Sequence, residues 1–281
     1  MPVSATSLRA RLMAWVSVTV GLGLGVSLAV VFWGAADMRQ RDALAYVDQL
    51  ARNNAVQLQL SLDEAALTAR GLAQGLAGVQ QAGRADRRAA NAQMQAVLAA
   101  RPGFVGVWTG WEPDAFDGQD AAHAGQAGHD ASGRFIPYWN RGSGQVAVEP
   151  LVDYDKPGPG DYYQLPKRSG KDVLVEPYAY PLGGKEVLIT TLSSPILVGG
   201  RFAGVAGVDV TLDSLQTAVA RLKIYDSGYA SLMSSTGIVV GDRDPARVGK
   251  PVAADARFAE ALAAVGDGRS HVVRRTDPAL G

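Results

Sequence analysis

A long uncharged segment near the amino terminus constrains the fold of this 281-residue chain more than any other feature. No charged residue occurs from Leu12 to Ala36, and the apolar core of the segment covers residues 12–34. A helix rises about 1.5 Å per residue, so this core would extend roughly 34 Å, enough to cross a hydrocarbon layer of about 30 Å. Trp15 and Trp33 lie near its ends, where indole rings favour the membrane interface. We therefore predict a transmembrane helix at residues 12–34.

The residues next to this segment predict its orientation. Arg9 and Arg11 precede it, and basic residues are enriched on the cytoplasmic side of membrane spans, so residues 1–11 are predicted to be cytoplasmic. The alternative is a cleaved signal peptide with Ala35 and Ala36 at the cleavage site. The apolar part of a signal peptide is usually about 7–15 residues long, which favours an uncleaved anchor here.

The composition excludes several classes of function. Lys and Arg number 27, and Asp and Glu also number 27, so the chain lacks the basic surplus with which nucleic-acid-binding proteins neutralise phosphates. There is no Cys, which excludes disulfide frameworks, thiolate zinc sites and thiol nucleophiles. Only three His are present and no GxSxG motif accompanies them, so we predict neither an enzyme nor a bound cofactor.

Two of the three His lie in an acidic loop whose composition could suggest a metal site. The loop carries Asp114, Asp117 and Asp120 ahead of His123 and His129. Their spacing matches neither a calcium-binding EF-hand loop nor an HExxH zinc motif. We therefore predict a hydrated surface loop and no metal.

Two helices are expected after the membrane segment. Residues 37–81 contain no Pro, and apolar residues recur at spacings of mostly three or four, which is typical of an amphipathic helix. We therefore predict a tall stalk helix at residues 37–83. A second helix is expected from Arg84 to Ala100, because a Pro and a Gly follow at positions 102 and 103.

Beyond Gly103 the sequence changes to short β-rich segments separated by Gly and Pro. The predicted strands lie at residues 104–111, 134–140, 146–148, 173–180, 186–198 and 201–210. Gly199-Gly200 is expected to form a two-residue hairpin turn. A helix at 212–222 leads to a second set of short strands from Gly228, with a helix at 255–265 and a strand at 268–275. The fold class is therefore α+β. Because no second span or output region follows, we expect the chain to be a fragment of a longer protein.

Two segments of this β-rich region resemble a known family. Residues 160–215, which include a hairpin ending in GVDV, and residues 128–141 (GHDASGRFIPYWNR) resemble the double Cache sensor domain of bacterial methyl-accepting chemotaxis proteins. The resemblance implies two PAS-like α/β subunits on the long helix. Residues 84–211 would form the membrane-distal, ligand-binding subunit, and residues 212–281 the membrane-proximal subunit, expected to be incomplete. It also implies a homodimer in the cell membrane, with the sensor in the periplasm or outside the cell.

Strand alternation identifies candidate ligand-binding side chains, because residues two apart share a face of a sheet. Glu176, Tyr178 and Tyr180 share one face of the strand predicted at 173–180. On the strand that ends in GVDV, Gly207 and Asp209 share a face, and the small glycine should leave room for a ligand beside the carboxylate.

Further aromatic and acidic residues are expected to complete this site. Tyr162 and Tyr163 follow Asp161 at a predicted turn, and Trp139 lies on a predicted strand. The candidate ligand-binding residues are therefore Asp161, Tyr162, Tyr163, Trp139, Glu176, Tyr178, Tyr180 and Asp209. Aromatic faces and carboxylates together suit a cation. The alternative for Asp209 is that it only caps the helix that begins near residue 212.

The resemblance also implies how an amino acid would be bound. In family members of that kind, an Arg two residues before an aromatic pair binds the ligand carboxylate, and an Asp in the GVD segment binds the ammonium group. A Tyr and a second Asp lie on the strand that follows the pair. Here the aromatic pair corresponds to Tyr162-Tyr163, the strand Tyr to Tyr178 and the ammonium-binding Asp to Asp209. However, Gly160 stands where the Arg would be and Tyr180 where a second Asp would be, so the bidentate carboxylate fork is missing.

We therefore predict the ligand-sensing domain of a chemoreceptor, which binds a small molecule, an amine or another cationic metabolite, and signals across the membrane. The resemblance leaves an alternative open, since the same domain occurs in other receptors. The chain would then be the amino-acid-sensing Cache domain of a histidine kinase or of a cyclic-dinucleotide enzyme whose output domain is missing.

Overall fold

The computed structural model describes residues 8–225 and 228–252. The chain divides into two compact units, residues 1–54 and 55–281. The first seven residues, and the helix and strand expected at 255–265 and 268–275, lie outside the described residues.

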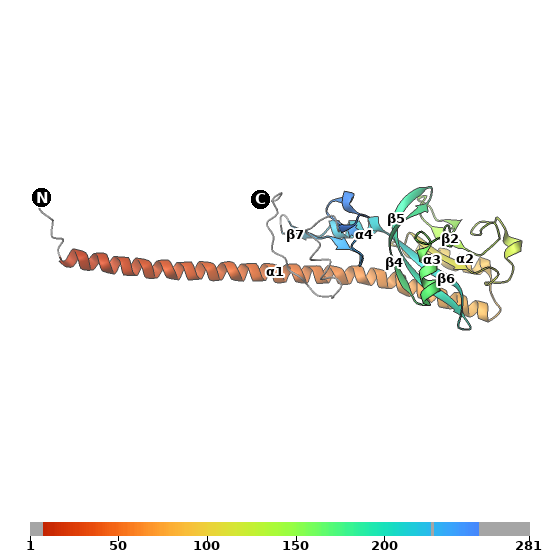
Figure 1. The fold of residues 1–281 in the computed structure, drawn as a ribbon, viewed down its shortest axis with the longest axis horizontal. Helices are drawn as coiled ribbons and strands as arrows, with labels where there is room; N and C mark the ends of the chain where they lie inside the picture. Colours follow the sequence, from red (N-terminus) through yellow and green to blue (C-terminus); the bar gives the residue numbers. More distant parts are fainter. Residues whose placement is uncertain (1–7, 226–227, 253–281) are drawn as a thin grey trace. The chain divides into compact units, whose positions relative to one another are not determined.

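Helix α1 (Leu8–Gln81) runs through both the predicted span and the predicted stalk without a break (Figure 1). Of the described helices, it is the one that is long and apolar enough to cross a membrane. Within the second unit, apolar side chains at spacings of three and four face the core, including Ala65, Ala69 and Leu72. The amphipathic pattern therefore predicted this buried face correctly.

Helix α2 (Arg87–Ala100) begins three residues later than the sequence suggested. Asp86 is its N-cap, and the carboxylate accepts hydrogen bonds from the backbone N–H groups of Arg88 and Ala89 at 2.8 and 3.1 Å. This cap satisfies two of the free amide groups at the start of the helix and fixes where it begins.

A six-stranded antiparallel sheet forms the centre of the second unit. Its strands are β1 (Gly106–Trp111), β2 (Pro137–Asn140), β3 (Ala147–Pro150), β4 (Val173–Leu182), β5 (Lys185–Val198) and β6 (Arg201–Thr211). Their spatial order is β3-β2-β1-β6-β5-β4. Val198 pairs with Arg201, and Gly199 and Gly200 between them both have positive φ, so the predicted hairpin turn is confirmed. The α+β class is confirmed as well.

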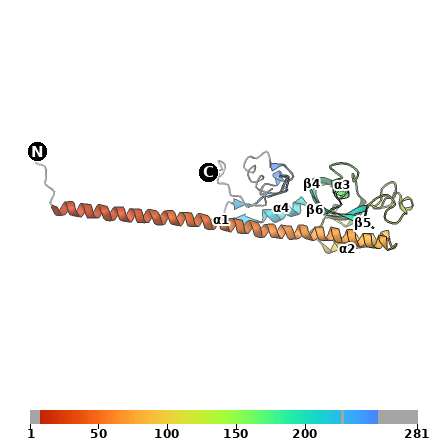
Figure 2. The same ribbon diagram turned by 60° about the horizontal axis from the view of Figure 1, so that its bottom comes forward.

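The two faces of the sheet build two separate cores. Helices α1 and α2 cover one face, and helix α3 (Asp161–Ser169) covers the other (Figure 2). Along β6, Ala206 and Val208 belong to the core under α1 and α2, whereas Val205 belongs to the core under α3. Gly207 and Asp209 therefore share the α3 face with Val205, as alternation predicts.

Strand β4 departs from strict alternation. Its register with β5 shifts between Val175 and Tyr178, so the strand contains a β-bulge with one extra residue. As a result Val175 and Tyr178, three positions apart, lie in the same core under α3. The predicted face that joined Glu176 to Tyr178 and Tyr180 is wrong for this reason.

A smaller group of elements follows the sheet. Helix α4 (Leu212–Ala220) leads to the short strands β7 (Lys223–Ile224), β8 (Gly228–Tyr229), β9 (Leu232–Met233) and β10 (Val239–Gly241) and the turn η2 (Pro245–Arg247). The N-cap of α4 is Thr211, whose hydroxyl accepts a hydrogen bond from the backbone N–H of Ser214 at 3.2 Å. The interpretation of Asp209 as a helix cap is therefore wrong.

The acidic loop between β1 and β2, which contains the short helix η1 (Asp120–His123), is more buried than its composition predicts. The Arg87 guanidinium binds both carboxylate oxygens of Asp117 at 2.6 and 2.8 Å, Asp120 at 2.6 Å and the carbonyl oxygen of Gly133 at 2.8 Å. Asp120 and His129 are buried. Among the described residues, no group of three or more His, Asp or Glu side chains could hold a metal ion. The loop is thus tied to α2 by one buried cation.

We expect the substitution Arg87→Gln to destabilise the fold by about 3 kcal/mol, because it leaves two poorly solvated carboxylates without a cation. Urea unfolding of the full chain in lipid nanodiscs, followed by circular dichroism, measures the change. The control is Arg52→Gln, which removes an exposed pair with Asp48 and should leave the midpoint unchanged. Equal midpoints for the two variants would contradict a structural role for the Arg87 cluster.

Candidate functional site

Asp209 is the centre of the candidate site. It lies near the end of β6, and only 2% of it is exposed. The hydroxyl of Thr191 donates a hydrogen bond to its Oδ1 at 2.7 Å, and the indole N–H of Trp108 donates to the same atom at 3.1 Å. Thr191 is the partner of Asp209 in the β5–β6 register, and Trp108 is the β1 partner of Gly207. The pairing of the three central strands therefore brings both donors to the carboxylate.

The charge of Asp209 has no cationic partner among the described ion pairs. Burial raises the pKa of Asp209 to about 6, and the hydrogen bonds from Thr191 and Trp108 only partly oppose this effect. A buried carboxylate that stays ionised at neutral pH is costly unless a positive charge joins it. In the part of the chain that the structure describes, no ion pair supplies that positive charge.

Five aromatic side chains surround this carboxylate, and we refer to them as the aromatic cluster. They are Trp108, Tyr138, Tyr162, Tyr178 and Tyr180. Tyr162 and Tyr178 are nearly parallel, with ring centroids 6.3 Å apart, whereas Trp108 meets Tyr162 edge-on at 5.1 Å. Tyr180 meets Tyr138 edge-on at 5.5 Å. The cluster thus presents both ring faces and ring edges around one negative charge.

A hydrogen-bond chain connects the cluster to the carboxylate. The Thr191 hydroxyl gives its single proton to Asp209, so the Tyr178 hydroxyl must donate to Thr191, 2.8 Å away. Burial and the Asp209 charge raise the pKa values of Tyr138 and Tyr178. Burial also raises that of Tyr162. The tyrosines therefore stay neutral at physiological pH, and Asp209 carries the only charge of the group.

A cavity of about 300 Å³ lies beside the aromatic cluster. Tyr138 and Tyr180 form the part of its wall that it shares with the cluster, and Glu149 stands on another side. The Glu149 carboxylate accepts a hydrogen bond from the side-chain amide of Asn140 at 3.0 Å. The cavity is bordered by Gly183 and Gly184 of the β4–β5 turn. A small molecule can thus reach the outer side of the two rings.

Tyr163 and Asp161, two of the predicted residues, lie on the α3 side of the sheet but outside the aromatic cluster. Tyr162 and Tyr163 belong to the first turn of α3 and not to a loop, so their side chains point in different directions. The Tyr163 hydroxyl donates to Glu112 at 2.5 Å. The side chain of Asp161 accepts a hydrogen bond from the backbone N–H of Gly158 at 3.2 Å at the start of the helix. The prediction that these two residues join Asp209 is not supported by their positions.

Two further predicted residues lie away from this face. Trp139 packs against the core under α1 and α2, and its indole N–H donates to Asn91 of α2 at 2.8 Å. Its neighbour Tyr138 faces Asp209 instead, because adjacent strand residues point to opposite faces. The Glu176 carboxylate accepts a hydrogen bond from the hydroxyl of Ser235 at 2.7 Å, beyond the sheet, because the bulge in β4 turns it away.

The structure thus brings Asp209, Tyr162, Tyr178 and Tyr180 together and adds three residues that the sequence did not single out. Thr191, Trp108 and Tyr138 reach the site through strand pairing. Trp108 fills the space expected beside Gly207, since a Cβ on that glycine would overlap the indole ring. The room that the sequence suggested for a ligand is therefore taken by this ring.

Comparison with known proteins assigns the fold to a family. Residues 92–217 match the family described as methyl-accepting chemotaxis protein-like, first PDC sensor domain. The chain is similar to the methyl-accepting chemotaxis protein TlpQ of Pseudomonas aeruginosa, with 30% identity over 203 residues. This match covers 66% of the chain and 28% of TlpQ, so the chain spans well under half of that relative.

Solved structures agree with this match. The extracellular domain of the histidine kinase mmHK1S-Z2 is 37% identical, with a TM-score of 0.75 over 85% of this chain and 89% of that domain. The ligand-binding domain of the Pseudomonas aeruginosa amino-acid chemoreceptor PctB, in complex with L-Arg, shares the fold at 21% identity, with a TM-score of 0.50 over 74% of this chain and 69% of that domain. The chain therefore belongs to the family of Cache (PDC) sensor domains.

Proposed function

We propose that the chain is the ligand-sensing part of a membrane chemoreceptor and that its distal sheet binds the ammonium group of a small amine. The observation that carries this proposal is the buried Asp209 carboxylate, which has hydrogen-bond donors around it and no described ion pair. An ammonium group would supply the missing charge. The cavity walled by Tyr138 and Tyr180 is the route by which the ligand would approach.

The aromatic cluster suits the same ligand. A desolvated ammonium group is attracted to the faces of Tyr and Trp rings within about 6 Å. Because the tyrosine hydroxyls remain neutral, they add no competing negative charge, and a single carboxylate matches a single ammonium. We propose Asp209, Tyr162, Tyr178 and Tyr180 as the binding residues, together with Trp108.

An amino acid is the alternative ligand, since the related domain of PctB was solved with L-Arg. Its α-carboxylate would need a cationic partner. On this face of the sheet, Arg134 and Lys167 both bind the carboxylate of Glu112, at 3.2 and 2.9 Å, and are engaged there. Gly160 offers no side chain. These contacts favour an amine over an α-amino acid.

The remaining predictions about organisation belong to the same proposal. Residues 84–211 would form the ligand-binding subunit and residues 212–281 the membrane-proximal one, with residues 12–34 in the membrane and the sensor in the periplasm. Ligand shifts signalling only as far as its affinity differs between two states of the sensor. A histidine kinase is the alternative whole protein, because such a kinase carries the similar domain with 37% identity.

Isothermal titration calorimetry of the full chain in nanodiscs tests the ligand class. We expect propylammonium to bind and propionate not to bind, with L-alanine weaker than propylammonium. Asp209→Asn should weaken propylammonium binding about 100-fold, because it removes one partner of a buried charge pair.

Asp161→Asn is the matched control, since it changes an acidic residue outside the aromatic cluster and should leave the affinity unchanged. Tight binding of L-alanine or propionate, or equal affinities for wild type and Asp209→Asn, would overturn the amine proposal.

The raised pKa of Asp209 predicts how affinity depends on pH. A free-state pKa of about 6 means that the carboxylate is protonated at pH 5 and must lose its proton before it pairs with an ammonium group. Propylammonium should therefore bind about tenfold more weakly at pH 5 than at pH 8, with proton release at the lower pH. Calorimetry in buffers of different ionisation enthalpy measures both. A flat profile in wild type would contradict the role of Asp209, whereas Asp209→Asn should be flat.

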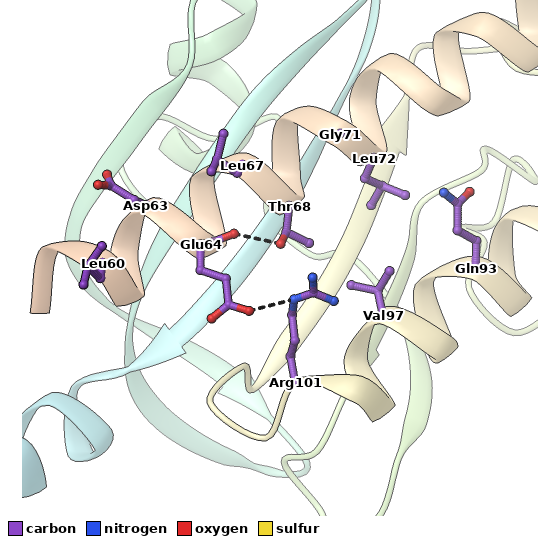
Figure 3. A pocket seen from close by; sticks show the side chains of 10 residues that line it. All are labelled: Leu60, Asp63, Glu64, Leu67, Thr68, Gly71, Leu72, Gln93, Val97 and Arg101. Atoms are coloured by element: carbon purple, nitrogen blue, oxygen red, sulfur yellow. Dashed lines mark hydrogen bonds and ion pairs between the residues drawn. The ribbon is translucent and has the colours of Figure 1, made fainter. Parts of the chain in front are cut away.

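We also propose that the sensor works as a homodimer through a groove between α1 and α2 (Figure 3). Leu60 and Leu67 line the groove and are 57% and 62% exposed, one heptad apart on α1. Arg101 of α2 binds Glu64 across the groove at 3.0 Å. Exposed leucines at heptad spacing suit a second copy of the same helix, and copies anchored in one membrane would present the same face.

We expect Leu60→Glu together with Leu67→Glu to lower the dimer fraction at least about tenfold, because two buried charges would face each other across the symmetry axis. Single-molecule photobleaching in membrane vesicles counts the copies. Leu197→Glu, an exposed leucine on β5, is the control and should leave the dimer intact. A wild-type chain that is monomeric would refute the dimer directly.

A further inference from the structure

A second cavity lies between the six-stranded sheet and the β9–β10 hairpin. Its volume is about 330 Å³, which is within the usual range of small-molecule sites. It is separate from the Asp209 site, because neither Asp209 nor any residue of the aromatic cluster lines it. We name it the seam cavity, since both the sheet and the smaller group of elements supply its walls.

Most of the wall is apolar. The apolar side chains of the wall come from α1, β4, α4, β9 and β10 and include Leu62, Leu174, Leu215, Leu232, Met233 and Val240. An empty apolar volume of this size forfeits packing contacts that a ligand would restore. The cavity therefore suits a molecule with a compact apolar body.

One side of the seam cavity carries a carboxylate. Glu176 lines it, and its Oε1 accepts a hydrogen bond from the Ser235 hydroxyl at 2.7 Å. Its Oε2 is buried and has no hydrogen-bond partner in the described part of the chain. Burial opposes ionisation, but the hydroxyls of Ser234, Ser235 and Thr236 outweigh it and lower the pKa of Glu176. The carboxylate is therefore negative at neutral pH, and the described residues that line the cavity include no Lys, Arg or His.

From this combination we infer that the seam cavity binds a small amphiphilic cation, with its ammonium group at Glu176 and its apolar body among the leucines. An anion would meet a like charge, and a neutral molecule could donate a hydrogen bond to Oε2 but would leave the charge of the carboxylate uncompensated. Such a ligand touches the sheet and the β9–β10 hairpin at once, so it would hold the two together. This inference does not depend on the Asp209 site.

The test uses the full chain in nanodiscs with Asp209→Asn present throughout, so that the first site does not contribute. The probe is benzylammonium, and benzyl alcohol is its neutral counterpart. Calorimetry should show one saturable site for benzylammonium and at least tenfold weaker binding of benzyl alcohol. Hydrogen exchange at residues 228–241 should slow when the probe binds.

Added substitutions distinguish the seam cavity from other sites. Glu176→Gln should weaken benzylammonium at least about tenfold, and Met233→Trp, which fills the cavity without removing the charge, should do the same. Glu149→Gln, at the other cavity, should have no effect. Absence of saturable binding in the Asp209→Asn chain, or unchanged binding in both cavity variants, overturns the inference. Loss of the Asp209 effect on propylammonium, by contrast, overturns only the proposed function.

Discussion

The buried carboxylate of Asp209 constrains how the centre of the sheet is built. Asp209 needs donors, and the two neighbouring strands supply them as Thr191 and Trp108. The indole of Trp108 fits only because its β1–β6 partner, Gly207, has no Cβ. The ring of Tyr138 likewise occupies the space that a Cβ on Gly106 would fill. The two glycines therefore make room for the rings that enclose the Asp209 carboxylate. Exchange of either glycine for alanine would force these rings to move.

Most of the architecture follows from local patterns. The uncharged run, the apolar periodicity of α1 and the Gly199-Gly200 turn each depend on neighbours in sequence, and the structure agrees with all three. The ends of helices were harder to predict from the sequence where a single capping side chain determines them. Asp86 starts α2 by capping it, and Thr211 starts α4, although Asp209 and other polar residues nearby offered equal candidates.

The site was harder to predict because it depends on register. Counting back from the hairpin turn with Val198 opposite Arg201 would pair Asp209 with Thr190, but a bulge between Ile196 and Leu197 moves the pairing to Thr191. The residue types at this position do not predict a bulge. In contrast, Asp209 itself could be found, because its acidic side chain on an otherwise apolar strand is the kind of departure that accompanies function.

The bulge in β4 affects the charge at the Asp209 site. In a regular strand Glu176 would share the face of Tyr178, and a second carboxylate would stand beside Asp209. Two carboxylates so close would share a proton or demand a divalent partner. The extra residue rotates Glu176 outward and keeps a single negative charge among the rings. One extra residue in β4 thus determines how many negative charges lie among the aromatic rings.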